Sequence, residues 1–264
     1  MLSGSMNSLK EIKRTDRRLK LKVVACGVLA RELYRIAAAA KSIIDIQLLP
    51  QGLHDEPDKL RQRLQQQIDA LPEEGMHYDA ILLGYGLCCN GLAGITARNI
   101  PLIVPRGHDC ITILLGSKET YKDYFDTHGG VYWYSPGWIE RSLQPGKERY
   151  ERTLQQYTER YGEDNALYLM ETENSWHKEY SLATYIDWEM PDSEEYKGYA
   201  RECAAYLGWG YDELPGDKGL LQHLLNGDWN NDEFLTVPPG SIIVPNVNSP
   251  GIVACKPYNK EAKS

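Results

Sequence analysis

Three cysteines in the sequence each follow closely on an apolar stretch that is long enough for one β-strand. They are Cys26, Cys88 and Cys110. The carboxyl ends of parallel strands lie at one edge of a sheet, where neighbouring strands are about 4.8 Å apart, and ligands bind in the crevice beyond that edge. We therefore expect these three side chains to converge on one small volume, although they are far apart in the sequence.

Thiolate ligation of a metal is the chemistry that such a group of side chains suits. Zinc takes Cys and His ligands in a tetrahedral arrangement, and a catalytic site leaves one position open. Three thiolates can instead hold an iron–sulfur cluster. His108, two residues before Cys110, is the candidate fourth ligand or a partner of a ligand. We predict a metal ion (zinc) or an iron–sulfur cluster held by Cys26, Cys88, Cys110 and His108, although the sequence has no C-x-x-C motif.

Two other interpretations of the cysteines stay open. Free cysteine is among the most buried residue types, so Cys26 could simply fill space in the core. In a metal-free enzyme, one cysteine would be the nucleophile, activated by a helix N-terminus and by His108.

Glycines near the cysteines indicate close approach of the backbone to a ligand. Gly84-x-Gly86 does not have the spacing of the dinucleotide fingerprint, and no Gly-Lys-Ser/Thr follows it, so nucleotide binding is not indicated. We predict that Gly27 and Gly86 contribute to a binding site. Trp138 follows a predicted strand and is expected to form a wall of the same crevice.

Four further residues are candidates for catalysis. Arg106 could hold a substrate carboxylate with two hydrogen bonds, or it could form a surface ion pair. Tyr85 could hydrogen-bond a ligand or cap the core. Glu171 or His177, in the second half of the chain, could face the cysteines across a cleft and act as the general base.

Strands and helices are expected to alternate along the chain, which predicts βαβ units and a parallel sheet. The fold class is α/β, with a mainly parallel Rossmann-like sheet, flanking helices and two α/β lobes. The predicted strands are 21–25, 43–49, 78–84, 101–105, 130–134, 166–170 and 234–237. The predicted helices are 28–40, 58–71, 109–115, 121–125, 147–161, 177–186, 193–207 and 220–225, and 92–98 is expected to be a short helix or a turn.

The predicted organisation has four parts. Residues 1–20 are polar and basic and form a disordered lead-in, and residues 21–144 form the lobe that carries the cysteines. Residues 145–245 form the second lobe, and residues 246–264 form a C-terminal tail.

Composition excludes some classes of function. A formal net charge of -8 over 264 residues argues against broad nucleic-acid binding, which needs a basic surface. No apolar run approaches the roughly 20 residues that span a bilayer, and the N-terminus lacks an apolar signal core. We expect a cytoplasmic protein. The excess of 18 Tyr and 6 Trp over 2 Phe suits half-wet surfaces such as clefts.

Several short strings resemble, in their order, a bacterial and archaeal family of unknown function numbered 1638. The strings are Ala25-Cys26-Gly27, Tyr85-Gly86-Leu87-Cys88, His108-Asp109-Cys110, Leu115-Gly116-Ser117, Gly137-Trp138-Ile139-Glu140, Tyr161-Gly162-Glu163-Asp164-Asn165-Ala166 and Val237-Pro238-Pro239-Gly240. The resemblance implies that the protein is encoded beside corrinoid-dependent methyltransferase systems. It therefore implies a role in one-carbon or methylated-amine metabolism, with a corrinoid protein or a methyltransferase as partner. The family pattern has one cysteine at the position of Cys88, so Cys89 is an addition.

The leading hypothesis is a thiolate-ligated metalloenzyme that acts on a small polar substrate in a cleft between the lobes. The metal would act as a Lewis acid or activate a bound nucleophile. A carrier that binds a metal or a corrinoid without catalysis is the first alternative, and a metal-free cysteine-dependent transferase is the second.

Overall fold

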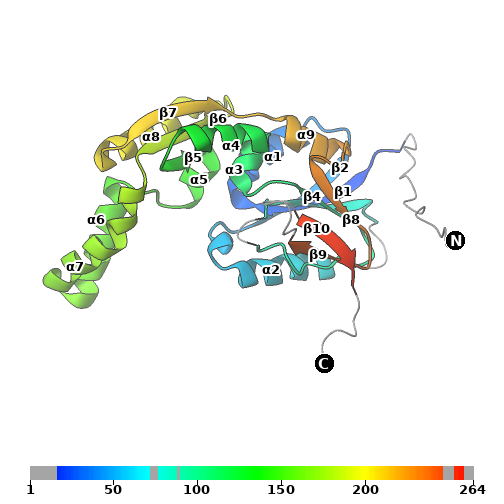
Figure 1. Ribbon diagram of the computed structural model, residues 1–264, viewed down its shortest axis with the longest axis horizontal. Coiled ribbons are helices and arrows are strands. Elements are labelled where there is room, and N and C mark those ends of the chain that lie inside the picture. Colours follow the sequence, from blue (N-terminus) through cyan, green and yellow to red (C-terminus); the bar gives the residue numbers. More distant parts are fainter. Residues whose placement is uncertain (1–16, 72–76, 88–89, 246–252, 259–264) are drawn as a thin grey trace.

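The computed structural model describes residues 17–71, 77–87, 90–245 and 253–258 (Figure 1). Its strands are β1 (Lys20–Cys26), β2 (Ile43–Leu49), β3 (Ala80–Gly84), β4 (Leu102–Pro105), β5 (Val131–Tyr134), β6 (Leu182–Asp187), β7 (Gly210–Pro215), β8 (Phe234–Val237), β9 (Ser241–Pro245) and β10 (Val253–Pro257). Its α-helices are α1 (Ala30–Ala37), α2 (Pro57–Asp69), α3 (Cys110–Leu115), α4 (Lys118–Thr127), α5 (Pro136–Arg141), α6 (Lys147–Tyr161), α7 (Glu163–Glu173), α8 (Ser193–Leu207) and α9 (Gly219–Asn226). Short 3-10 helices are η1 (Gly27–Leu29), η2 (Leu53–Asp55) and η3 (Asn174–Glu179).

The larger sheet has the strand order β2-β1-β3-β4-β8. Its first four strands are parallel, and β8 joins β4 antiparallel. Every residue of β3 is buried, as expected for a central strand of a sheet that is covered on both faces. Figure 1 shows α1 and α9 on one face of this sheet and α2 on the other. Helix α2 presents Leu60, Leu64 and Ile68 to the core, because residues four apart lie on one helix face.

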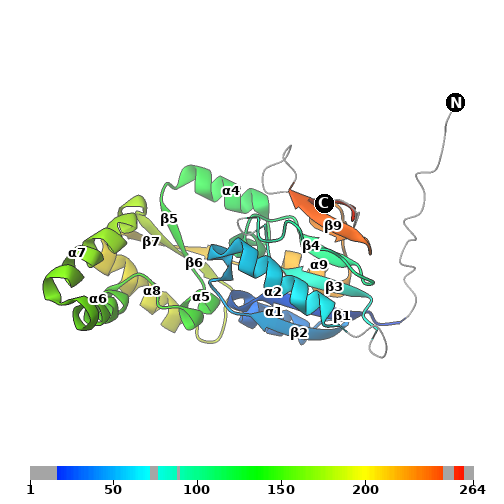
Figure 2. The same ribbon diagram turned by 90° about the horizontal axis from the view of Figure 1, so that it is seen from below.

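The smaller sheet is parallel, with the order β5-β6-β7, and α8 packs against it. Its core is aromatic and includes Tyr134, Tyr185 and Trp209. Helices α6 and α7 extend from this half of the molecule as an arm (Figures 1 and 2). The α/β class with mainly parallel strands is therefore confirmed.

Two predicted elements of the second half are wrong, and one strand there was not predicted. Residues 166–170 are apolar in sequence and were predicted as a strand, but they lie inside α7, where Ala166 and Met170 are buried one helical turn apart. The predicted helix 177–186 is instead η3 followed by β6. Strand β7 was not predicted, because its acidic and half-exposed residues lack the apolar alternation of a typical strand.

The chain crosses between the two sheets twice. Strand β5 lies before residue 145 but pairs with β6 in the smaller sheet, and β8 returns to the larger sheet late in the chain. The boundary between the two predicted lobes, at residues 144 and 145, stays a prediction. Strand β5 of the smaller sheet comes before this boundary, and strand β8 of the larger sheet comes after it. Most of the predicted lead-in and most of the predicted tail lie outside the described residues. Among the helices of the described ranges, none is long and apolar enough to cross a membrane.

Candidate functional site

Cys26 and Cys110 lie together beyond the carboxyl ends of two parallel strands of the larger sheet. Cys26 is the last residue of β1, and Cys110 is the first residue of α3, which follows β4. The Cys110 thiol is within hydrogen-bonding reach of the Cys26 sulfur. Both cysteines are buried, and neither forms a disulfide. The structure therefore brings together two of the three predicted thiols.

The surroundings of Cys26 favour its thiolate. The hydrogen bond from Cys110 is the largest influence on the pKa of Cys26, and it lowers that pKa. Burial opposes this effect, while the N–H of Val28 and the charge of Arg141 lower the pKa further. The net result is a pKa below the ordinary value of a thiol, which is what a nucleophile or a metal ligand needs.

The loops that follow β3 and β4 lie against each other. A Cβ atom at Gly86 would come within 2.4 Å of the backbone nitrogen of Asp109, so only glycine fits there. The N–H of Leu87 donates to the carbonyl of Gly107 at 2.8 Å. Gly86 thus allows close approach to a neighbouring loop, whereas we predicted close approach to a ligand. Cys88, the third predicted ligand, lies outside the described residues and directly follows Leu87.

His108 does not join the two cysteines in a metal-binding group. Within the described ranges, no three His, Cys, Asp or Glu side chains are grouped closely enough to hold a metal ion. His108 instead lines a separate surface cavity together with Tyr121 and Phe125. The next residue, Asp109, accepts hydrogen bonds from the N–H groups of Ile111 and Thr112 and so caps α3. The turn that forms this cap sets His108 and Cys110 apart, and the prediction of His108 as a ligand is not supported.

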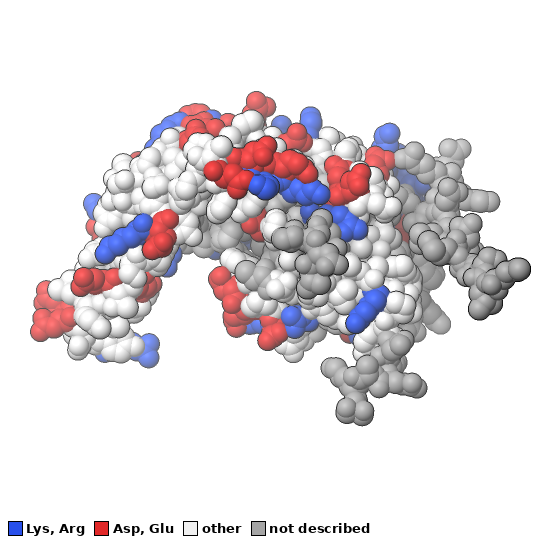
Figure 3. Space-filling model, viewed as in Figure 1, with Lys and Arg blue, Asp and Glu red and all other residues white. Residues whose placement is uncertain are grey.

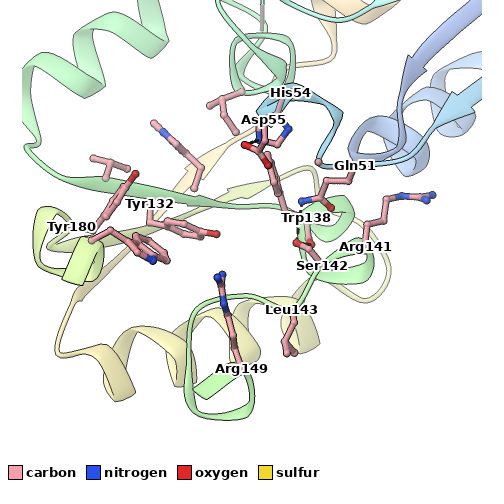
Figure 4. A pocket seen from close by; sticks show the side chains of 15 residues that line it. Gln51, His54, Asp55, Tyr132, Trp138, Arg141, Ser142, Leu143, Arg149 and Tyr180 are labelled. Carbon is pink, nitrogen blue, oxygen red and sulfur yellow. Dashed lines mark hydrogen bonds and ion pairs between the residues drawn. The ribbon is translucent and has the colours of Figure 1, made fainter. Parts of the chain in front are cut away.

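A cavity of about 550 Å³ lies beside the cysteine pair, between the two sheets. Such a volume is in the range of small-molecule sites. Its walls come from η2 and the loop before it, α3, β5, α5, α6 and η3 (Figure 4). The lining residues are Gln51, Gly52, His54, Asp55, Ile111, Val131, Tyr132, Trp133, Trp138, Arg141, Ser142, Leu143, Arg149, Trp176 and Tyr180. Figure 3 shows the molecular surface hollowed between the α6–α7 arm and the half that holds the larger sheet.

Two neighbours connect this cavity to the cysteines. Ile111 lines the cavity and directly follows Cys110. Arg141 also lines the cavity, and its charge acts on Cys26. A Cβ atom at Gly27 would lie 3.1 Å from Cδ of Arg141. Gly27 therefore gives room to the Arg141 side chain rather than to a ligand.

Helix α5 holds its side chains in the cavity wall through tight packing on η1. A Cβ atom at Gly137 would lie 1.8 Å from the carbonyl oxygen of Val28, so a side chain there is excluded. Ser135 caps α5 by accepting a hydrogen bond from the N–H of Trp138 at 3.4 Å. Trp138 stands in the cavity wall and meets His54 edge-to-face, with 5.6 Å between the ring centroids.

The cavity lining is positively charged although the protein is acidic. The described lining residues include two arginines, Arg141 and Arg149, and one carboxylate, Asp55, whereas the chain as a whole has a net charge of -8. Asp55 lies 3.3 Å from the ring of His54. In the described part of the chain, Arg141 has no ion pair, while Arg149 is 3.7 Å from Glu173. An anionic group is therefore the ligand chemistry that this lining favours.

Two predicted catalytic residues have structural roles. The Nε–H of Arg106 donates to the carbonyls of Asn231 at 2.8 Å and Phe234 at 3.2 Å, so its guanidinium holds the loop before β8 in place. Tyr85 is 2% exposed and packs in the core of the larger sheet. Neither side chain lines the cavity between the sheets.

The two predicted bases do not face the cysteines. Glu171 is exposed on α7, in the projecting arm. His177 contacts the ring of Trp176, with 4.1 Å between centroids, and lines a separate cavity of about 380 Å³. Burial, together with the charge of Arg149, lowers the pKa of His177. The general-base role that we predicted for either residue finds no support in these positions.

The prediction missed most of the residues that line the cavity. Two of these residues lie in elements that were not predicted: Arg141 in α5 and Trp176 in η3. The elements of Tyr132 and Arg149 were predicted, but their orientation depends on the smaller sheet. The excess of Tyr and Trp over Phe was the available signal, because rings with a polar atom suit a half-wet cleft. This overall composition does not indicate which of the Tyr and Trp residues line the cavity.

One comparison with known proteins gives a match. The model of a family described as a protein of unknown function (DUF1638) matches residues 48–225. That range is more than half of the 264 residues, so the chain belongs to this family, and the resemblance seen in the sequence is confirmed. The chain has no significant match among curated proteins or among solved structures.

Proposed function

We propose that this DUF1638 protein is a thiolate-ligated metalloenzyme that acts on a small polar substrate bound in the cavity between its two sheets. The observation that carries the proposal is the contact between Cys26 and Cys110 beside that cavity. These residues are 84 positions apart, and only the parallel pairing of β1, β3 and β4 brings them to one edge of the sheet.

The ligand set is Cys26, Cys110 and Cys88. Cys88 enters the set from the sequence alone, since it directly follows the loop that is hydrogen-bonded to Gly107. Three thiolates leave a fourth position of a tetrahedral zinc site open, and they also suit an iron–sulfur cluster. When bound, the metal would supply Lewis acidity or an activated nucleophile. Arg141 offsets the negative charge of the thiolates, because its guanidinium acts on Cys26.

A metal-free cysteine enzyme is the second candidate, and the lowered pKa of Cys26 favours it. In that case the Cys26 thiolate is the nucleophile. The N–H of Val28 and the charge of Arg141 stabilise the thiolate, and Cys110 donates a hydrogen bond to it.

The cellular context is a further part of the proposal. We place the protein in the cytoplasm, where free thiols stay reduced. A role in one-carbon or methylated-amine metabolism, beside a corrinoid protein or a methyltransferase, rests on the family resemblance alone.

The metal content of protein purified without oxygen tests the proposal. We expect about one metal ion or one cluster per chain, measured by elemental analysis and by the absorption spectrum. Cys26→Ser, Cys110→Ser and Cys88→Ser should each weaken metal binding by about tenfold or more, because each removes a ligand. Cys89→Ser and Cys203→Ser are the matched controls and should keep the metal.

The same proteins separate the two candidates. Wild-type protein without metal, and with thiols that titrate freely, would refute the metalloenzyme. The metal-free enzyme would then require that Cys26→Ser abolish labelling by a small alkylating reagent at this site. It would also require that a chelator leave the labelling unchanged.

A further inference from the structure

We infer that the cavity between the sheets binds an organic acid, with its carboxylate on Arg149 and its flat or apolar body against the aromatic wall. This inference names the substrate class of the proposed enzyme and rests on that proposal for its catalytic meaning. The binding itself can be measured without any metal or turnover.

The aromatic wall is built before any ligand arrives. The ring centroid of Tyr132 lies 6.1 Å from that of Trp176 and 5.5 Å from that of Tyr180. The centroids of Trp176 and Tyr180 are also 5.5 Å apart. Trp133 and Trp138 line other parts of the cavity. Contacts of this kind restrict the side chains to one arrangement, so little conformational entropy is lost when a flat ligand binds against them.

Arg149 is placed to receive the anionic group. It projects from α6 into the cavity towards Tyr132 (Figure 4). Its guanidinium lies over the Trp176 ring, 5.8 Å from the centroid, which orients its planar group of donors. The nearest carboxylate, that of Glu173, is 3.7 Å away, beyond a normal hydrogen bond. A guanidinium with free donors pairs with a carboxylate through two parallel hydrogen bonds.

The charges in the cavity wall argue against a cationic ligand. Aromatic faces alone would also attract an ammonium group. Here, however, Arg149 would repel such a group, and the one carboxylate among the described lining residues, Asp55, already lies beside His54. The combination of the Arg149 guanidinium with five aromatic side chains therefore selects an acid with an apolar body.

Tryptophan fluorescence provides the test, because three tryptophans line the cavity. The wild-type protein is titrated with phenylacetate, phenylacetamide and benzyltrimethylammonium, which share a benzyl body and differ in charge. We expect phenylacetate to change the fluorescence at lower concentration than the other two. The Arg149→Met variant should raise the apparent Kd for phenylacetate about tenfold or more, since a charge-assisted pair is lost.

Matched variants separate binding from folding and from the thiol chemistry. Arg152→Met removes an exposed arginine from the same helix and should leave the Kd unchanged. Cys26→Ser should also bind phenylacetate normally, so this inference can hold even if the proposed metal site fails. Equal or tighter binding of phenylacetamide or benzyltrimethylammonium would overturn the inference. So would an absent response to phenylacetate, or an Arg149→Met variant that folds and binds phenylacetate normally.

Discussion

Cys26 is the residue at which several local effects act on one side chain. It lies at the end of a strand and directly before a helical turn. A hydrogen bond from Cys110 and the charge of Arg141 both lower the pKa of its thiol. Each effect comes from a different segment of the chain. The low thiol pKa is therefore a property of the fold and not of the Ala25-Cys26-Gly27 string.

Glu32 gives a prediction at the residue scale. Its side chain is fully buried in α1, and among the described residues no other residue donates a well-formed hydrogen bond to its carboxylate. Burial raises the pKa of Glu32 from 4.5 to about 7, although the backbone N–H of Glu32 itself lowers it; the charge of Glu140 also raises it, and the charge of Arg31 lowers it. Burial is the main cause of the raised pKa of Tyr185, and the charge of Glu32 in turn raises that pKa further.

The sign of the pH dependence follows from that shift. Between pH 4.5 and about 7 the folded protein holds a proton that the unfolded chain has lost. Stability therefore falls as the pH rises through this range, by about 3 kcal/mol in total. Glu32→Gln cannot ionise and should be more stable than the wild type at pH 8, with little difference near pH 4. Urea unfolding at several pH values measures this, and the exposed Glu202→Gln should not change the dependence.

At the scale of elements, close backbone packing positions the cavity wall. Helix α5 carries Trp138 and Arg141, and it sits directly on η1, the turn that follows Cys26. Gly137 makes this approach possible. The packing of α5 on η1 in this way holds one part of the cavity wall next to Cys26.

A pair of glycine variants tests this contact. Gly137→Ala would place a Cβ atom against the Val28 carbonyl and should lower the free energy of unfolding by about 2 kcal/mol or more. In Gly198→Ala, on α8, the added methyl group meets no atom within 4 Å. That change should stabilise the protein by up to about 1 kcal/mol, because alanine favours a helix. Equal effects in urea unfolding would contradict this account of α5.

At the scale of the whole molecule, Trp188 joins the two halves. It follows β6 of the smaller sheet, yet its side chain packs in the core cluster of the larger sheet. The guanidinium of Arg35 donates to the backbone carbonyl of Trp188. The indole N–H of Trp188 donates to the carbonyl of Leu114 at 3.0 Å. This contact places the smaller sheet beside α3, which begins with Cys110.

Trp188→Phe should loosen this junction. The variant removes one of two donors to the Leu114 carbonyl, which keeps the N–H of Asp217 at 3.1 Å. The lost hydrogen bond should lower the free energy of unfolding by about 1 kcal/mol. Trp229→Phe is the control, because its indole bonds the Leu224 carbonyl only five residues away. We expect limited proteolysis to cut Trp188→Phe faster in the segments that connect the sheets. Identical cleavage of the two variants would refute the junction.

The sequence by itself determined the α/β class with mainly parallel strands, the strands β1 to β5 and the meeting of Cys26 with Cys110 at strand ends. Those features depend on local periodicity and on the rule that parallel strands end at one edge. Apart from Trp138, which was expected in the wall of a crevice, only the tertiary structure decided which residues form the cavity. Strand β7 and helix α7 are defined by packing against neighbours rather than by their own pattern. The cap formed by Asp109 likewise turned His108 away from Cys110, which their spacing of two residues could not reveal.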